Sequence, residues 1–277
     1  MKYISKYLAK EIRNKMRILS KLDENGDNQY RDGLKCESSF YCRKNETIAI
    51  EKNAQIHSFR IEHPELTVPF NVPKNTERAL IKEGIENIQN AFYWAKGAFD
   101  KKDMSEDYIR NIAGYITPEL YPGILANYRD TGTNITGASV TPPDPYKMRT
   151  IEMPTFTDKL TKKLTQRGPI GTIIAATYAH LHLVRIHPFV DGNGRTARVL
   201  QDTILSENSV PVPIIEAGER NTYYDFLDRA VYDWKHIKHS GELKHGATHG
   251  EKDFYNFMAG KVNVSIDKLL DCVRDKI

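Results

Sequence analysis

Apolar residues recur at intervals of three and four along most of the chain. In residues 2–22 they share the chain with Lys and Arg on the opposite face, which predicts an amphipathic helix. Residues 169–186 are apolar nearly all the way round, as is typical of a helix at the centre of a fold. The same spacing predicts further helices at about 75–99, 105–116, 196–205 and 254–273. The pattern therefore favours an all-α protein.

Three stretches interrupt this pattern. Residues 23–32 are rich in Asn, Asp and Gly, which predicts a loop. Residues 64–73 contain three prolines, which predicts a boundary between an N-terminal extension and the rest of the chain. Residues 133–145 alternate around Gly137 and end in prolines, which favours a short β-hairpin over a surface loop closed by prolines.

The composition of the 277-residue chain is that of an ordinary globular protein, with 40% hydrophobic and 27% charged residues. Its net charge of +4 is too small to indicate nucleic-acid binding. No apolar run is long enough to predict a membrane span or a secretory leader. Cys36, Cys42 and Cys272 make no disulfide framework and no zinc pair, so we expect reduced thiols in a cytoplasmic protein.

Candidate chemistry is concentrated in residues 187–198, which read His-Pro-Phe-Val-Asp-Gly-Asn-Gly-Arg-Thr-Ala-Arg. Gly192 and Gly194 allow backbone N–H groups to approach an anion without interference from Cβ atoms. The helix predicted to follow them brings its N-terminus, which favours negative charge, to the same point. Arg195 and Arg198 lie three residues apart, so both can reach phosphate oxygens. The stretch is therefore predicted to be a phosphate site.

Two other side chains of this stretch can take part in a reaction on a bound phosphate. His187 has an ordinary pKa near neutrality and can accept a proton from an attacking hydroxyl. Asp191 offers a hard oxygen ligand for Mg²⁺, which usually binds one or two carboxylates together with substrate phosphates. A zinc site that also uses His180 and His182 is disfavoured, because residues two apart do not share a helical face. We expect His180 to be a hydrogen-bonded core residue.

The stretch resembles, residue for residue, the signature His-Pro-Phe-x-Asp/Glu-Gly-Asn-Gly-Arg-x-x-Arg of the Fic (filamentation induced by cAMP) family. The resemblance extends over about residues 75–260. It implies an all-α fold, namely a Fic-type helical bundle with a small β-hairpin flap and an N-terminal helical extension. The extension would comprise residues 1–70 and the Fic domain residues 71–277, with its core at about 105–210.

The resemblance implies a protein adenylyltransferase (AMPylator), which transfers AMP from ATP to a Ser, Thr or Tyr hydroxyl of a target protein or of itself and releases pyrophosphate. His187 would deprotonate the hydroxyl, and Asp191 would hold Mg²⁺ against the α- and β-phosphates. The remaining positions of the motif would bind the nucleotide, namely Gly192, Asn193, Gly194, Arg195 and Arg198. Asn193, Arg195 and Arg198 are also implied to act in catalysis.

A segment before the Fic core is similar to the form Ser/Thr-x-x-x-Glu-Gly/Asn, by which many Fic proteins inhibit themselves. Thr47 and Glu51 fit this form, but Lys52 stands where Gly or Asn is expected. The resemblance implies that Glu51 pairs with Arg198 and occupies the guanidinium needed by the γ-phosphate of ATP. An ordinary helix carboxylate is the other interpretation of Glu51. A second segment, at Glu86, fits less well because it lacks the Ser or Thr.

The implied partners are ATP and a protein target, with neither nucleic acid nor membrane, and a homodimer is compatible with the resemblance. Thr133, Ile135 and Gly137 fall in the expected flap, which in Fic enzymes holds the target by pairing with its backbone. One of Tyr223 and Tyr224, in a segment similar to the family's Arg-x-x-Tyr-Tyr-x-x-Leu, is implied to border the adenine. Tyrosines on a helix are more commonly packing residues.

Other functions stay open at this point. The chain could be a deAMPylase controlled by the inhibitory Glu, or a family member that transfers another nucleotide or phosphate compound. Members of the second kind depart from Gly-Asn-Gly-Arg, whereas this chain does not. It could also be a catalytically silent module that regulates or binds a target.

Overall fold

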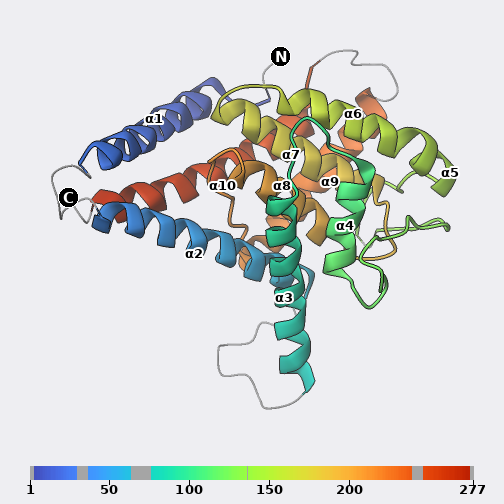
Figure 1. Cartoon of the computed structure of the whole chain (residues 1–277). Helices are drawn as coiled ribbons and strands as arrows, with labels where there is room; N and C mark the ends of the chain where they lie inside the picture. Colours follow the sequence, from blue (N-terminus) through green and yellow to red (C-terminus); the bar gives the residue numbers. More distant parts are fainter. Residues whose placement is uncertain (1–2, 30–36, 64–75, 136, 239–245, 275–277) are drawn as a thin grey trace.

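The computed structural model describes residues 3–29, 37–63, 76–135, 137–238 and 246–274. Its longer helices are α1 (Lys6–Gln29), α2 (Glu37–Glu62), α3 (Thr76–Gly97), α4 (Glu106–Ile116), α6 (Met153–Leu164), α7 (Pro169–Ile186), α8 (Asn193–Ser206), α9 (Arg220–Asp233) and α10 (His249–Arg274). Short helical turns join some of them: α5 (Pro145–Lys147), η2 (Met148–Glu152), η3 (Ala217–Glu219) and η4 (Trp234–Lys238). The prediction of an all-α fold is confirmed (Figure 1).

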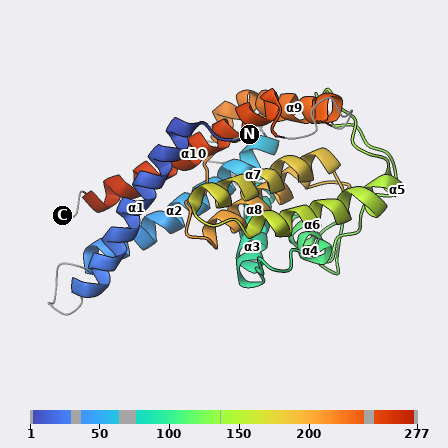
Figure 2. The ribbon, with the colours of Figure 1, turned by 90° about the horizontal axis from the view of Figure 1, so that it is seen from above.

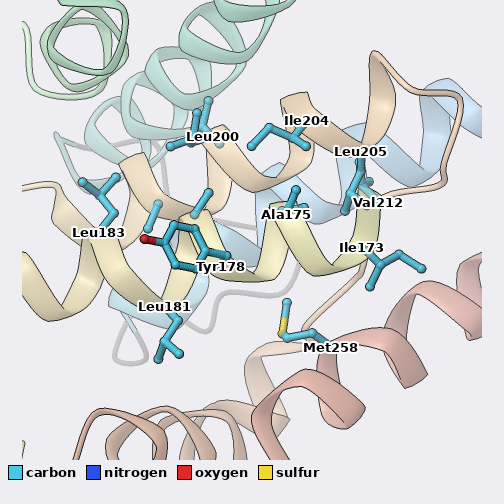
Figure 3. Close-up of a cluster of buried hydrophobic side chains, with 14 of the residues drawn as sticks. Ile173, Ala175, Tyr178, Leu181, Leu183, Leu200, Ile204, Leu205, Val212 and Met258 are labelled. Atoms are coloured by element: carbon cyan, nitrogen blue, oxygen red, sulfur yellow. The ribbon is translucent and has the colours of Figure 1, made fainter. Parts of the chain in front are cut away.

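Helix α7 lies at the centre, as its apolar surface predicts. It contacts α8 most extensively and also touches α6, α9, α10 and α1. Ile173, Ala175, Leu181 and Leu183 of α7 are all buried (Figure 3). A helix that buries every face can hold the residue that follows it in a fixed position, since almost none of its side chains can move into solvent. That residue is His187.

Helices α1 and α2 pack directly on the rest of the chain. Helix α1 lies along α10 and touches α7, while α2 contacts α10, α8 and α3 (Figures 1 and 2). Ile12 and Leu19 of α1 and Ile61 of α2 are fully buried. These contacts bring the last turn of α2 against the start of α8. A segment far upstream in the sequence therefore becomes part of the candidate site.

The structure differs from the sequence-based expectations at three places. Residues 23–29, expected to form a loop, continue helix α1 as far as Gln29, because extending a nucleated helix adds one hydrogen bond per residue and outweighs weak propensities. The expected β-hairpin is not formed, since the described residues around Gly137 contain no strand. A two-stranded hairpin without a third strand is marginally stable. Cys272 forms a disulfide bond, so the expectation of three free thiols is wrong.

No helix within the described ranges combines the length and the apolar character that a membrane crossing requires.

Candidate active site

The loop between α7 and α8 begins at a residue with a rare backbone conformation. Pro188 disfavours the helical conformation in the residue before it, so α7 ends at Ile186. His187 adopts φ 52° and ψ 59°, and its N–H still donates to the carbonyl oxygen of Leu183 at 2.9 Å. Residues other than Gly rarely occupy this left-handed region, and those that do occur often at functional sites.

Asn193 fixes the shape of this loop from within. Its Oδ1 accepts the N–H of Phe189 at 2.9 Å, and its Nδ2 donates to the carbonyl oxygen of Phe189 at 2.8 Å. Both residues are buried. The Asn193 side chain therefore stabilises the loop, and the expected contact between Asn193 and a nucleotide stays a prediction.

Arg129 ties the loop to the segment that precedes α5, and sequence reasoning did not assign it a role. Its backbone N–H donates to the carbonyl oxygen of Pro188 at 2.9 Å, and its Nε donates to that of His187 at 2.7 Å. Its two terminal nitrogens donate to the carbonyl oxygens of Thr131 and Pro143. Arg129 is almost wholly buried, so it acts as a positioning residue for His187.

The imidazole of His187 has the tautomer that a general base requires. Its Nδ1 lies 3.3 Å from the carbonyl oxygen of Val184, which can only accept a hydrogen bond, so Nδ1 carries the proton. The lone pair is then on Nε2. Burial lowers the pKa of His187, the bond to Val184 opposes this, and the Arg129 guanidinium lowers it further. The ring is therefore unprotonated at neutral pH.

The start of α8 is the expected anion-binding side of the site. Gly192 has φ 77° and precedes the helix, and a Cβ there would lie 3.1 Å from Ile116 and Thr117. A Cβ on Gly194 would lie 2.4 Å from Oε1 of Glu62. The left-handed conformation of Gly192 therefore favours Gly, whereas a side chain at Gly194 would displace the carboxylate of Glu62. The first N–H groups of α8 have no partner within the helix and favour an anion.

Asp191 and Arg195 form an ion pair across the first turn of α8. Arg195 donates to Oδ2 of Asp191 at 2.9 Å. The Asp191 side chain is 62% exposed, whereas the Arg195 side chain is 11% exposed. The carboxylate can thus meet a ligand from solvent while the guanidinium stays in place beside the glycines.

Arg198 points toward the last turn of α2. Its Nε donates to Oγ of Ser58 at 2.8 Å, and its terminal nitrogen donates to the Ser58 carbonyl oxygen at 3.0 Å and to Oε1 of Glu62 at 2.6 Å. We call Ser58, Glu62 and Arg198 the clamp. Burial would raise the pKa of Glu62, but Arg198 outweighs it and holds that pKa below its ordinary value. Burial would likewise lower the pKa of Arg198, yet Glu62 keeps it raised.

The expected pairing of Glu51 with Arg198 is wrong. Glu51 instead accepts from Lys96 at 3.1 Å and from Ser206, at the other end of α8, at 2.5 Å. Glu62 occupies the place beside Arg198. The segment Ser58-Phe-Arg-Ile-Glu62 fits the inhibitory form as well as the segment from Thr47 to Glu51 does, with His63 where Gly or Asn is expected. Glu86, the second candidate, lies beside Lys82 on the surface.

Tyr223 and Tyr224 differ in what they can reach. Tyr223 is fully buried, so it cannot stack on a purine, and the expectation of a nucleotide contact is corrected for this residue. Its hydroxyl lies 2.7 Å from Nε2 of His180 and accepts a weak bond from Arg198 at 3.5 Å. Tyr224 is partly exposed, and its hydroxyl lies 3.4 Å from Glu62. The core role expected for His180 is confirmed, and burial lowers its pKa to about 3.

The residues expected to hold a target follow Arg129 in the chain. Thr133 and Ile135 are partly buried, and Gly137 is exposed with φ 78°. Ser139, just beyond them, donates from its N–H to Oδ1 of Asp228 at 2.7 Å. This segment is therefore held to α9 at one end and to the His187 loop, through Arg129, at the other.

Comparison with characterised proteins points to one family. A family profile described as the Fic/DOC family matches residues 103–205. A protein adenylyltransferase Fic from Drosophila persimilis is 53% identical over 55 residues, which are 20% of this chain and 11% of that protein. One from Nematostella vectensis is 29% identical over 185 residues, or 66% of this chain and 41% of that protein. The matched segments thus span less than half of these relatives.

The fold agrees with this match. The crystal structure of a Fic domain-containing signaling protein from Bacteroides thetaiotaomicron superimposes with a TM-score of 0.64 and 17% identity, covering 86% of this chain and 97% of that one. The matched residues 103–205 contain α4, α6, α7, the His187 loop and nearly all of α8. Residues 103–205 of the chain thus form a Fic domain of the Fic/DOC family.

Proposed function

We propose that the chain transfers AMP from ATP to a hydroxyl group of a protein and that Glu62 restrains this activity. The observation that carries the proposal is the placement of His187, with the lone pair of its ring on Nε2, in the same loop as the N-terminus of α8 and the guanidiniums of Arg195 and Arg198. The base and the anion pocket are then only a few residues apart in one loop. The names of the relatives as protein adenylyltransferases support the same reaction.

In the proposed step, Nε2 of His187 accepts the proton of the target hydroxyl while the oxygen attacks the α-phosphorus of ATP. The bond to the β-phosphate oxygen breaks, and pyrophosphate leaves. The N–H groups at the start of α8, together with Arg195, face the negative charge that develops on the phosphates. Arg129 keeps the imidazole in place by holding the carbonyl of the same residue.

The residues present fit a Mg²⁺ ion that arrives with the nucleotide. Asp191 offers an exposed carboxylate next to the glycines, and Mg²⁺ is commonly held by one or two carboxylates plus substrate phosphates. The described residues contain no cluster of three or more His, Cys, Asp or Glu side chains that could hold a metal, and in this proposal ATP and water supply the other ligands. Such an ion would neutralise charge on the phosphates.

The clamp explains how the activity is restrained. In the structure one terminal nitrogen of Arg198 donates to Ser58 and to Glu62, and its Nε donates to Ser58. These nitrogens, on the side of the guanidinium that faces α2, therefore have no donor left for a γ-phosphate. Glu62 also brings negative charge next to Gly194, where a phosphate would approach. ATP must therefore either displace Glu62 or bind in a pose that leaves its α-phosphate out of line with the hydroxyl.

The test is label transfer with purified protein in Mg²⁺. Glu62→Gly protein is incubated with ATP labelled at the α-phosphate or at the γ-phosphate, with and without a cell lysate. We expect protein-bound label only from the α-labelled ATP, and none in Glu62→Gly/His187→Ala. Transfer of γ-label would instead indicate a phosphotransferase. Absence of both labels, or label that survives the loss of His187, would refute the proposal.

A further inference from the structure

A second charged cavity lies away from the His187 loop, between α6, α7 and η4. Its volume is about 180 Å³. Helices α6 and α7 lie side by side (Figure 1), and their side chains line the cavity together with Tyr3, Glu152, Trp234 and Lys238. From α7 come Tyr178, His182 and Arg185, which are four and three residues apart and so share one face of the helix.

Basic side chains outnumber acidic ones in this cavity. Lys159, Lys163, Arg185 and Lys238 line it together with one carboxylate, Glu152. Glu152 is paired with Arg185 at 2.7 Å. Lys238 is paired with Glu251, which lies just outside the lining, at 3.0 Å. Both nearby carboxylates are therefore taken, and the two lysines of α6 remain.

Lys163 is the unsatisfied member of this group. Its ammonium lies over the rings of Tyr178 and Tyr3, at 4.7 and 5.4 Å from their centroids. It has no hydrogen bond and no direct ion-pair partner among the residues that the structure describes, although it is half-buried, and Glu251 acts on it only at longer range. Burial lowers the pKa of Lys163, and the nearby Lys238 lowers it further. A half-buried cation costs free energy unless an anion approaches it.

His182 supplies a neutral donor to the same cavity. Its Nδ1 accepts a hydrogen bond from Nε of Arg185 at 3.2 Å, so the proton of the neutral ring is on Nε2. That N–H has no acceptor within the described part of the chain. His182 is only 5% exposed. Burial holds the pKa of His182 well below its ordinary value, and Arg185, Lys238, Lys163 and Lys159 all act in the same direction.

We infer that this cavity is a binding site for a phosphate-sized oxyanion, held by Lys163, Lys159 and the N–H of His182. The size of the cavity limits the ligand. At about 30 Å³ for each water of liquid volume, it holds roughly six waters, enough for a phosphate ion. It is smaller than the roughly 300 Å³ at which pockets for drug-sized ligands begin, so its size favours a small anion. None of its residues belongs to the His187 loop.

The test is a phosphate titration read by tryptophan fluorescence at constant ionic strength, with chloride as the reference anion. The chain has two tryptophans, and Trp94→Phe leaves Trp234, in the cavity wall, as the single indole. Phe retains an aromatic ring where Trp94 stacks on Tyr115. We expect a saturable change that is weakened at least tenfold by Lys163→Gln. Lys162→Gln is the matched control, since this neighbour on α6 is 72% exposed and paired with Asp158.

A thermal shift with the native tryptophans gives an independent readout. Phosphate in place of chloride should raise the Tm of the unaltered chain and of Lys162→Gln, and should raise that of Lys163→Gln much less. A response that does not saturate, or equal affinity in the two lysine variants, would overturn the inference. Because Lys163 lies outside the His187 loop, this outcome is independent of whether AMP transfer occurs.

Discussion

Replacement of Glu62 by Gly removes the carboxylate that meets Arg198 at 2.6 Å. A hydrogen bond to a charged group contributes about 1.5–3 kcal/mol net. The Glu62 side chain is 29% exposed, so we take a value near the lower half of this range, about 2 kcal/mol. If nucleotide must break this contact to bind productively, its loss should raise the rate of AMP transfer about thirtyfold, at about 1.4 kcal/mol for each factor of ten.

The assay is the initial rate of α-labelled AMP incorporation at a fixed ATP concentration. The unaltered chain is compared with Glu62→Gly and with Glu51→Gly. Both substitutions remove a helical Glu from α2, but Glu51 contacts Lys96 and Ser206 rather than Arg198. We expect acceleration only in Glu62→Gly. It should also unfold at a lower temperature, by a few degrees, because Arg198 then lacks its counter-ion.

Two results would contradict this reasoning. Equal rates in Glu62→Gly and the unaltered chain would show that the clamp does not limit productive binding. Equal acceleration by Glu51→Gly would show that any loosening of α2 is enough and that the contact with Arg198 has no special part.

Three other outcomes are expected. In the Glu62→Gly background, His187→Ala should lower the rate of AMP transfer about a hundred- to ten-thousand-fold, while the circular dichroism spectrum stays unchanged. A smaller loss would show that the imidazole of His187 is not the general base. Gly192→Ala should cost about 1–2 kcal/mol in urea unfolding, because φ is 77° and the added Cβ meets Ile116 and Thr117; an unchanged midpoint would contradict the strain. Burial raises the pKa of Asp202 from 3.8 to about 8, so the stability it contributes is complete below pH 3.8 and is lost as pH rises toward 8. The free energy of unfolding of Asp202→Asn should therefore rise relative to that of the unaltered chain by about 1.4 kcal/mol per pH unit across that window. Parallel curves of unfolding free energy against pH for the two proteins would show that this carboxyl is not protonated in the fold.

The local parts of the site were predictable from sequence. Pro188 after an apolar helix dictates where α7 ends, and Gly192 and Gly194 before a helical pattern dictate a turn that leads into α8. The buried position of His180 followed from its place in the most apolar segment. These features depend on neighbouring residues alone, so the order of side chains is enough to specify them.

The partner of Arg198 depended on the tertiary structure. Glu51 and Glu62 are eleven residues apart on α2, about three helical turns, so they lie on the same face and a sequence pattern cannot separate them. The packing of α2 against α8 decides that Glu62 meets Arg198 while Glu51 meets Ser206, one end of α8 for each carboxylate. The same holds for Tyr223, whose burial follows from the helices around it.

The sequence thus determined the fold class, the His187 loop with its expected base and anion pocket, and the resemblance to the Fic/DOC family. Only the tertiary structure decided which carboxylate restrains Arg198, how Arg129 holds the His187 loop, and that Lys163 and His182 share a cavity. The physical reason is the range of the interactions. Backbone conformation and helix ends are set by residues a few positions apart, whereas ion pairs and cavities depend on how whole helices are aligned with one another.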